Sequence, residues 1–292
     1  MSKYIYTGCG TALVTPFKNG EVDYDAYAKL VKRQVEAGIH FLVPLGTTGE
    51  TPCLEDEEKV KILQVAKEKA GGKKLVVGAG SNSLKHTLKT MELLEPHGVD
   101  AFLIVVPYYN KPTQQGQYEY FKAVAEATDK PIVMYNVPGR TGANMTAETT
   151  LRLAEIKNIV ATKEASSNYA QIAEIIKNAP KGFSVLSGND DETLPLMATG
   201  AHGVISVASN VAPVEMVQLV NALAEDDLVK ARKLHYKLMP LFKNCFVESN
   251  PIPAKAGLAA LGLIENELRS PLVPATKATY ELMDKTVKDL GL

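Results

Sequence analysis

The chain has 292 residues, of which 46% are apolar and 22% charged, so a sizeable core is expected and extensive disorder is excluded. This length allows one large α/β domain or two ordinary ones. The formal net charge is −1 at pH 7, with both signs mixed along the chain, which argues against the basic stripe of a nucleic-acid binder.

The N-terminal segment, the cysteines and the histidines indicate where the protein is located and whether it binds a metal. The start MSKYIYTGCG lacks the apolar core of a signal peptide, and no apolar run is long enough to cross a membrane. Cys9, Cys53 and Cys245 are odd in number and far apart, so we expect reduced thiols in a cytoplasmic protein. The five histidines form no H-x-x-x-H pair and have no neighbouring cysteine. We therefore expect no metal and no cofactor, and neither nucleic acid nor membrane as a partner.

Short apolar runs of β-strand character recur through the first part of the chain, and helical segments separate them. Two of the helical segments cover residues 25–38 and 57–72, and the second ends in the Gly-Gly pair expected at a helix C-terminus. The acidic residues 55–58 suit the positive end of its dipole. The predicted strands span residues 10–17, 40–46, 74–80, 100–107, 131–138, 159–163, 183–188 and 203–209.

This alternation predicts an α/β fold with parallel strands covered by helices. Eight such units, with no G-x-G-x-x-G after the first strand, favour a closed (β/α)8 TIM barrel over an open doubly wound sheet. From about residue 225 the strands stop, and helices are predicted over residues 225–242, 253–263 and 275–291. We therefore expect a catalytic barrel in residues 1–224 and a C-terminal helical extension in residues 225–292.

Polar residues stand where the predicted strands end, and in such a barrel this is the rim that carries the chemistry. Each has an ordinary alternative role, since Thr-Thr between glycines is often a tight turn, rim tyrosines often pack, and loop arginines are usually solvated. Their joint placement at one end of successive strands indicates a site. They are Thr47 and Thr48 after the second strand, Tyr108 and Tyr109 after the fourth, Tyr135 and Arg140 after the fifth, Lys163 at the end of the sixth, and the segments SGNDD and GVISV at the seventh and eighth.

The lysine at the end of the sixth strand invites a specific chemical hypothesis. Strand alternation puts Ile159, Ala161 and Lys163 on one face, with Val160 and Thr162 on the other. If the first face points into the barrel, desolvation lowers the pKa of the lysine, and its neutral amine can form a Schiff base with a ketone.

Schiff-base chemistry needs two further functions close to the amine. The iminium withdraws electrons, so a proton on the adjacent carbon can leave, and Tyr135 with a nearby threonine hydroxyl could carry that proton. The Thr47–Thr48 turn offers hydroxyls and backbone N–H groups to a small carboxylate.

The motifs GTTGE, YNVPGRTG, KEAS, SGNDD and GVISV, in this order and followed by FVESNPIPAK, closely resemble those of the dihydrodipicolinate synthases. These belong to the pyruvate-dependent class I aldolase family, which also contains N-acetylneuraminate lyase. The resemblance covers essentially the whole chain. It implies condensation of pyruvate with L-aspartate 4-semialdehyde, in lysine biosynthesis by the diaminopimelate pathway. It also implies a (β/α)8 barrel that assembles as a homotetramer, a dimer of dimers.

The resemblance assigns catalytic roles by position. Lys163 would be the Schiff-base lysine. Tyr135 would donate and accept protons, relayed through Thr47 to Tyr109. In this family the tyrosine that matches Tyr109 reaches into the site of a neighbouring subunit.

The resemblance also assigns substrate contacts. Thr48 would bind the pyruvate carboxylate, and Arg140 the carboxylate of the semialdehyde at the mouth of the site. Gly188 and Ile205 would contribute backbone atoms. Arg140 favours a short second substrate with a carboxylate over the polyhydroxylated sugar of a sialic acid lyase. A sibling 2-keto-acid aldolase or dehydratase, or a non-catalytic keto-acid-binding protein, remains the alternative.

One departure from the family pattern concerns feedback inhibition by L-lysine. Sensitive members bind the amino acid at a subunit interface, near the tyrosine that matches Tyr108. They commonly have a histidine where this chain has Lys59 and a carboxylate where it has His86. Lys59 would repel an ammonium group of the ligand, although Asp56 on the same predicted helix could offset part of this. We expect inhibition by L-lysine to be weak or absent.

Overall fold

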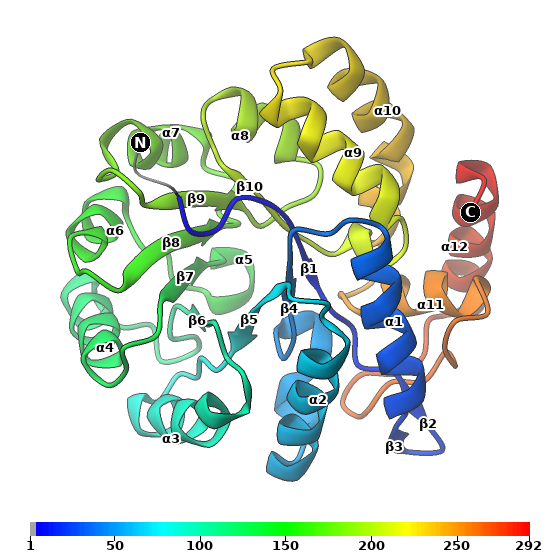
Figure 1. Ribbon diagram of the computed structural model, residues 1–292, viewed down its shortest axis with the longest axis horizontal. Helices are drawn as coiled ribbons and strands as arrows, with labels where there is room; N and C mark the ends of the chain where they lie inside the picture. The colour runs from blue at the N-terminus through cyan, green and yellow to red at the C-terminus, as the bar shows by residue number, and fades with distance from the viewer. Residues whose placement is uncertain (1–3) are drawn as a thin grey trace.

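Eight parallel strands form a closed barrel in the computed structural model, which describes residues 4–292 (Figure 1). The barrel closes because β1 pairs with both β10 and β4. The predicted (β/α)8 fold and all eight predicted strands are therefore confirmed, and the open sheet is wrong. The strands are β1 (Gly8–Ala12), β4 (Phe41–Val43), β5 (Lys74–Gly78), β6 (Ala101–Val105), β7 (Ile132–Asn136), β8 (Ile159–Glu164), β9 (Ser184–Ser187) and β10 (Gly203–Ser206).

The first strand is shorter than the predicted range of residues 10–17. It ends at Ala12, and Phe17 belongs instead to a small antiparallel hairpin of β2 (Phe17–Lys18) and β3 (Glu21–Val22). Asn19 and Gly20 between them have φ of 55° and 85°. Two central residues with positive φ make the tight turn that suits a two-residue hairpin, and Asn-Gly is the pair that adopts it most readily.

Helices cover the outside of the barrel between successive strands (Figure 1). The helices predicted over residues 25–38 and 57–72 are present, and the Gly-Gly stop after α2 is confirmed by φ of 56° and 82° at Gly71 and Gly72. At the start of α2 the Glu58 carboxylate accepts from the Glu55 backbone N–H at 2.9 Å, which satisfies one unpaired donor of the helix end. The helices are α1 (Tyr24–Glu36), α2 (Asp56–Lys69), α3 (Leu84–Leu94), α4 (Gln114–Glu126), α5 (Pro138–Thr141), α6 (Ala147–Ala154), α7 (Tyr169–Asn178), α8 (Thr193–Ala198) and α9 (Pro213–Ala224).

After α9 the described chain holds three helices and no strand, as predicted. These are α10 (Leu228–Asn244), α11 (Ile252–Ala260) and α12 (Lys277–Leu290). They pack on one another and on α9, on the side of the barrel where α1 also lies (Figure 1).

A buried ion pair ties this helical region to the barrel. The Lys255 ammonium on α11 donates to Glu50 Oε1 at 2.7 Å and to the Thr15 carbonyl at 2.8 Å, and both charged side chains are fully buried. The second Glu50 oxygen accepts from the Arg269 backbone N–H at 3.0 Å. Every oxygen and the ammonium thus have partners, and loss of either side chain would leave a buried charge unpaired, at a cost of about 3–5 kcal/mol.

Two apolar layers separate the inside of the barrel from the helix-covered outside. Alternate strand residues such as Val43, Leu103 and Leu186 form the inner layer, while their neighbours pack against helices. On β8 the predicted alternation is wrong at its start. Ile159 packs in the outer layer, and Val160 and Ala161 both lie in the inner one.

The reason is an irregularity in the pairing of β7 with β8. Ile132 pairs with Ile159, but Val133 pairs with Ala161, so Val160 is an extra residue on β8. Such a bulge shifts the alternation by one position. Lys163 still points inward, because the bulge lies before Ala161.

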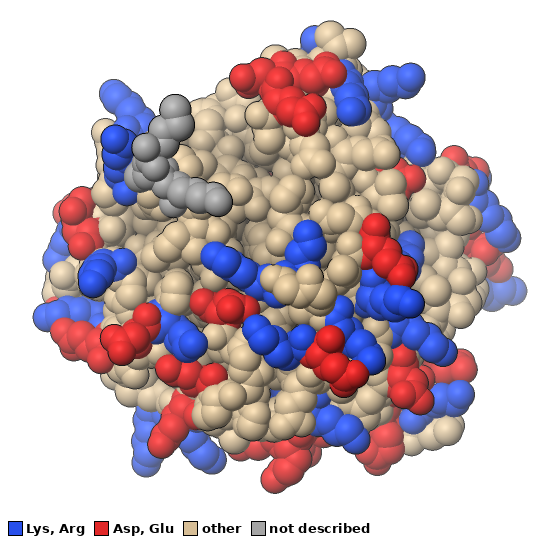
Figure 2. Space-filling view, viewed as in Figure 1, with Lys and Arg blue, Asp and Glu red and all other residues tan. Residues whose placement is uncertain are grey.

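The charge distribution on the surface, the length of the helices and the grouping of metal-binding side chains bear on possible ligands and partners. Basic and acidic side chains are interspersed over the face drawn in Figure 2, as the sequence indicates. Within residues 4–292, no helix is long and apolar enough to pass through a bilayer. In the same part of the chain, no three His, Cys, Asp or Glu side chains gather into a group that could hold a metal ion.

Candidate active site

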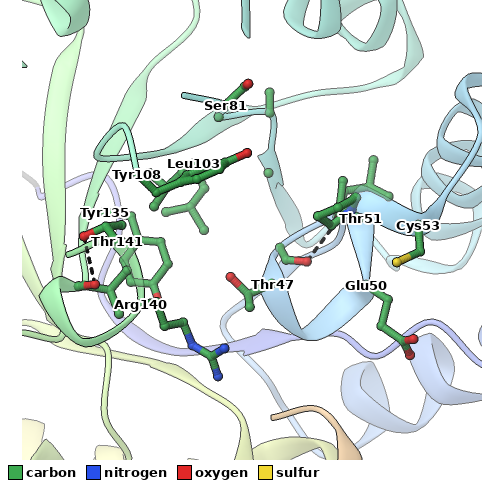
Figure 3. A pocket seen from close by; sticks show the side chains of 18 of the residues that line it. Thr47, Glu50, Thr51, Cys53, Ser81, Leu103, Tyr108, Tyr135, Arg140 and Thr141 are labelled. Carbon is green, nitrogen blue, oxygen red and sulfur yellow. Dashed lines mark hydrogen bonds between the residues drawn. The ribbon is translucent and has the colours of Figure 1, made fainter. Parts of the chain in front are cut away.

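The carboxyl ends of the strands enclose a small inner cavity of about 50 Å³. At about 10–15 Å³ per water this volume holds a few water molecules, or a ligand of a few heavy atoms. An outer cavity of about 720 Å³ adjoins it and shares several lining residues (Figure 3). The inner cavity is lined by Thr47, Thr48, Tyr135, Arg140, Lys163 and Gly188 of the predicted set, and by Asn189, Phe246 and Asn250 among others.

Lys163 lies in this cavity with only 6% of its surface exposed. Burial lowers the pKa of its ammonium to about 8, Asp190 opposes this, and Arg140 adds to it. Desolvation therefore outweighs the nearby carboxylate, and a useful fraction of the amine is neutral near neutral pH. A neutral amine at the end of a barrel strand is equipped to attack a ketone.

Tyr135 stands beside the lysine because their strands pair. β7 and β8 are in register at Tyr135 and Lys163, and the ammonium lies 4.2 Å from the centroid of the phenol ring. Burial raises the pKa of Tyr135 to about 12, although Arg140 lowers it. The phenol therefore carries its proton at neutral pH and can donate it to a developing oxyanion or hydroxyl beside the lysine.

The turn after β4 supplies hydroxyls to the same cavity. It is a 3₁₀ turn, Thr47–Gly49, in which Thr48 is buried and Thr47 is exposed toward the cavity. Thr48 Oγ1 accepts from Asn250 Nδ2 at 3.0 Å, so its own proton remains available to a ligand. This polar turn beside a lysine suits a small carboxylate.

Asn250 is a site residue that the sequence reasoning missed. Its side-chain Nδ2 donates to Thr48, and its backbone carbonyl accepts from Arg140 Nη2 at 3.5 Å. Its side-chain Oδ1 is buried without a partner among the described residues. It comes from the C-terminal helical region, which strand-end reasoning does not search. The available signal was the segment FVESNPIPAK, which contains it.

Arg140 lies at the junction of the two cavities. It belongs to α5, the short helix that follows β7, and it lines both the inner and the outer cavity. In Figure 3 its guanidinium and the Thr47 side chain point into the same open space. A positive group at this place can reach a second, charged ligand that approaches one already held in the inner cavity.

Gly188 fits the site only as a glycine. A Cβ at this position would lie 2.7 Å from Ala165 Cβ and 3.1 Å from Lys163 Cε. Its N–H donates to the Glu164 carbonyl at 2.6 Å. The backbone therefore approaches the lysine side chain closely and forms one wall of the cavity.

Two predicted residues are not brought to the cavity by this chain. Tyr109 is 87% exposed, has a φ of 71°, and lines neither cavity. Ile205 is fully buried in the inner layer of the barrel and also lines neither. Their roles stay predictions.

Comparisons with known proteins agree over nearly the full length. The model of the dihydrodipicolinate synthetase family matches residues 6–290. The 4-hydroxy-tetrahydrodipicolinate synthase of Fervidobacterium nodosum is 50% identical over 290 residues, which are 99% of each chain. The crystal structure of dihydrodipicolinate synthase from Thermotoga maritima superposes with a TM-score of 0.97 at 48% identity and 99% coverage of both chains. The enzyme from Cyanidioschyzon merolae with lysine bound superposes with a TM-score of 0.95 at 40% identity, covering 99% of this chain and 100% of that one.

The lowered pKa of Lys163 leads to a prediction about imine formation. The rate of borohydride trapping with pyruvate should rise about tenfold per pH unit below pH 8 and level off above it, because only the neutral amine attacks. Arg140→Ala should move the midpoint to higher pH, and Asp190→Asn should move it to lower pH. Mass spectrometry should locate the reduced adduct on Lys163. Labelling of another lysine, or midpoints that move in the opposite directions, would contradict this assignment.

Proposed function

The chain belongs to the dihydrodipicolinate synthetase family, and from this premise we propose that it condenses pyruvate with L-aspartate 4-semialdehyde to give 4-hydroxy-tetrahydrodipicolinate. It is then a lyase of the Schiff-base aldolase type, acting in lysine biosynthesis by the diaminopimelate pathway. The observation that carries the proposal is the buried amine of Lys163, with a pKa of about 8, beside the phenol of Tyr135.

The first half of the reaction makes a carbon nucleophile. The neutral amine of Lys163 attacks C2 of pyruvate, Tyr135 protonates the resulting hydroxyl, and water leaves to give an iminium. The iminium withdraws electrons, so a proton leaves C3 to the tyrosine oxygen and an enamine forms. Thr48 and the backbone N–H groups of its turn hold the pyruvate carboxylate meanwhile.

The second half joins the two substrates and frees the lysine. The enamine carbon attacks the aldehyde of the semialdehyde, whose carboxylate is held by Arg140, and the new alkoxide takes up a proton. The amino group of the second substrate then attacks the iminium carbon and displaces Lys163, which closes the ring. One water leaves over the whole cycle, and no redox partner is required.

Tyr109 would complete the site from a second copy of the chain. Its side chain is almost fully exposed at the rim and lines neither the inner nor the outer cavity. A tyrosine in this position can extend the proton relay of Tyr135 and Thr47 if another subunit packs on this rim. We therefore propose a homotetramer built from dimers that share their sites.

Two further assignments follow the same premise. We place the boundary between the catalytic barrel and the C-terminal helical region at residues 224 and 225, where α9 ends. We also infer a cytoplasmic location, which agrees with three free cysteines.

Arg140 should determine the second substrate. Arg140→Ala removes a charge-assisted contact worth about 1.5–3 kcal/mol, so the KM for aspartate semialdehyde should rise about 10- to 100-fold. Trapping with pyruvate, measured well above the pKa of Lys163, should stay close to wild type. Arg152→Ala is the matched control, because Arg152 stacks on Tyr118 away from the cavities.

The wild-type assay tests the proposed function itself. Condensation with aspartate semialdehyde and no cleavage of N-acetylneuraminate is expected. The reverse pattern would assign the chain to the lyase branch, and trapping with no turnover of either substrate would leave a keto-acid-binding protein.

Subunit mixing tests the shared site. Tyr109→Phe and Lys163→Ala should each be nearly inactive. After subunit exchange in an equal mixture, about half of the dimers hold one chain of each kind, and each such dimer has one complete site of two. The mixture should therefore recover roughly a quarter of wild-type activity. The matched control mixes Tyr135→Phe with Lys163→Ala, both within one chain, and should recover nothing. Equal activity in the two mixtures would refute a site shared through Tyr109.

We still expect weak inhibition by L-lysine, and the contacts of Asp56 support this expectation. Lys59 and His86 both line the outer cavity, together with Tyr108. The Asp56 carboxylate lies 3.0 Å from the Lys59 ammonium and 3.9 Å from that of Lys89, so it is already engaged by two cations. It is therefore poorly placed to bind an ammonium of the ligand.

A titration with L-lysine measures this directly. Wild type should keep most of its activity at millimolar L-lysine, and the double variant Lys59→His/His86→Glu should become more sensitive. Submillimolar inhibition of the wild type would show that Asp56 compensates after all.

A further inference from the structure

The outer face of the β7–β8 pair carries two polar residues directly behind the catalytic pair. Asn136 follows Tyr135 on β7, Glu164 follows Lys163 on β8, and the two followers are themselves in register. Both are fully buried. Since side chains alternate along a strand, they lie on the side opposite the cavity.

The Glu164 carboxylate is held by three donated hydrogen bonds. Asn136 Nδ2 donates to its two oxygens at 3.1 and 3.3 Å, and the Ser166 hydroxyl donates at 2.8 Å. Burial raises the pKa of Glu164 to about 7, while the bonds from Ser166 and Asn136 lower it. The carboxylate therefore depends on these donors, and it links the ends of the two strands from behind.

Asn136 extends this link into the neighbouring loop. Its Oδ1 accepts from the Met145 N–H at 3.0 Å, and its Nδ2 also donates to Asn144 Oδ1 at 2.9 Å. Its own carbonyl accepts from the Ala165 N–H at 2.9 Å. The end of β7 is thus tied both to β8 and to the segment before α6.

No comparable bonds hold the catalytic side chains on the cavity side. Neither Lys163 Nζ nor Tyr135 Oη donates to another residue in the described range 4–292, and they meet through the 4.2 Å contact of ammonium with ring. Their relative position therefore depends on where the two strand ends lie.

We propose that Glu164 is a positioning residue for the reaction, which through its hydrogen bonds to Asn136 holds Lys163 and Tyr135 at the separation that imine formation requires. This inference rests on the proposed function. Glu164 acts through geometry and not through its charge, because the groups that shift the pKa of Lys163 are Asp190 and Arg140.

The test compares three variants at positions flanking the lysine. Glu164→Ala removes the link, and the rate of borohydride trapping with pyruvate should fall about 10- to 100-fold, as expected for a displacement of about 1 Å. Glu164→Gln keeps the shape and one acceptor oxygen, and should lose only about 2- to 10-fold. Thr162→Val is the matched control, since Thr162 is the preceding outward residue of β8, fully buried, and its hydroxyl has no partner among the described residues.

The kinetic pattern separates positioning from a general loss of structure. With rates measured on protein shown to be folded by circular dichroism, kcat should fall in the two Glu164 variants while kcat/KM for aspartate semialdehyde stays within a factor of about two, because the first half of the reaction is slowed and the capture of this substrate at Arg140 is not. Thr162→Val should match wild type. Equal losses in Thr162→Val and Glu164→Ala, or wild-type trapping by Glu164→Ala, would overturn the proposal.

Two provisions keep the test decisive. If Glu164→Ala does not fold, Glu164→Gln with wild-type trapping overturns the proposal, and slower trapping with kcat/KM for aspartate semialdehyde preserved supports it. A crystal structure of a Glu164 variant in which the Lys163 ammonium stays 4.2 Å from the Tyr135 ring also overturns it, whatever the substrate. Failure of the wild type to trap pyruvate would instead count against the proposed function.

Discussion

Backbone pairing between β7 and β8 is the interaction on which the site depends. It sets Tyr135 beside Lys163 on the inside of the barrel and Asn136 beside Glu164 on the outside. In an open sheet the same two strands could pair, but the turn after β4 would not face them. Closure of the barrel, through the pairing of β1 with β4 and β10, brings that turn across the cavity from the lysine.

The site is produced by burial, and burial has a cost in stability. Lowering the pKa of Lys163 from 10.5 to about 8 corresponds to about 3 kcal/mol, which disfavours the charged form in the folded protein. Because the folded pKa lies below the unfolded one, this cost is absent above pH 10.5, grows as the pH falls from 10.5 to about 8, and is present in full below that. At neutral pH the reactive amine is therefore a destabilising feature that the rest of the barrel has to offset.

The C-terminal helical region supplies part of that support and part of the site. Lys255 and the backbone of Arg269 hold Glu50, which directly follows the turn of Thr48. Asn250 from the same region binds Thr48 and Arg140. The barrel provides the amine and the phenol, and the region after it fixes Thr48 and Arg140, the groups that we propose bind the substrate carboxylates.

The sequence by itself determined the eight strands, the C-terminal helices and most of the residues at the rim. These depend on local patterns, because alternating apolar runs and the punctuation between them are written along the chain. The position of Lys163 at the end of a strand followed from the same patterns, and so did its neighbours Tyr135 and Thr48.

Only the tertiary structure decided what depends on contacts between distant segments. The extra residue Val160 reflects how β8 fits against β7, and alternation along one strand cannot reveal it. Asn250 reaches Thr48 across some two hundred positions of sequence, and the pKa of Lys163 is set by desolvation, which exists only once the barrel closes around it.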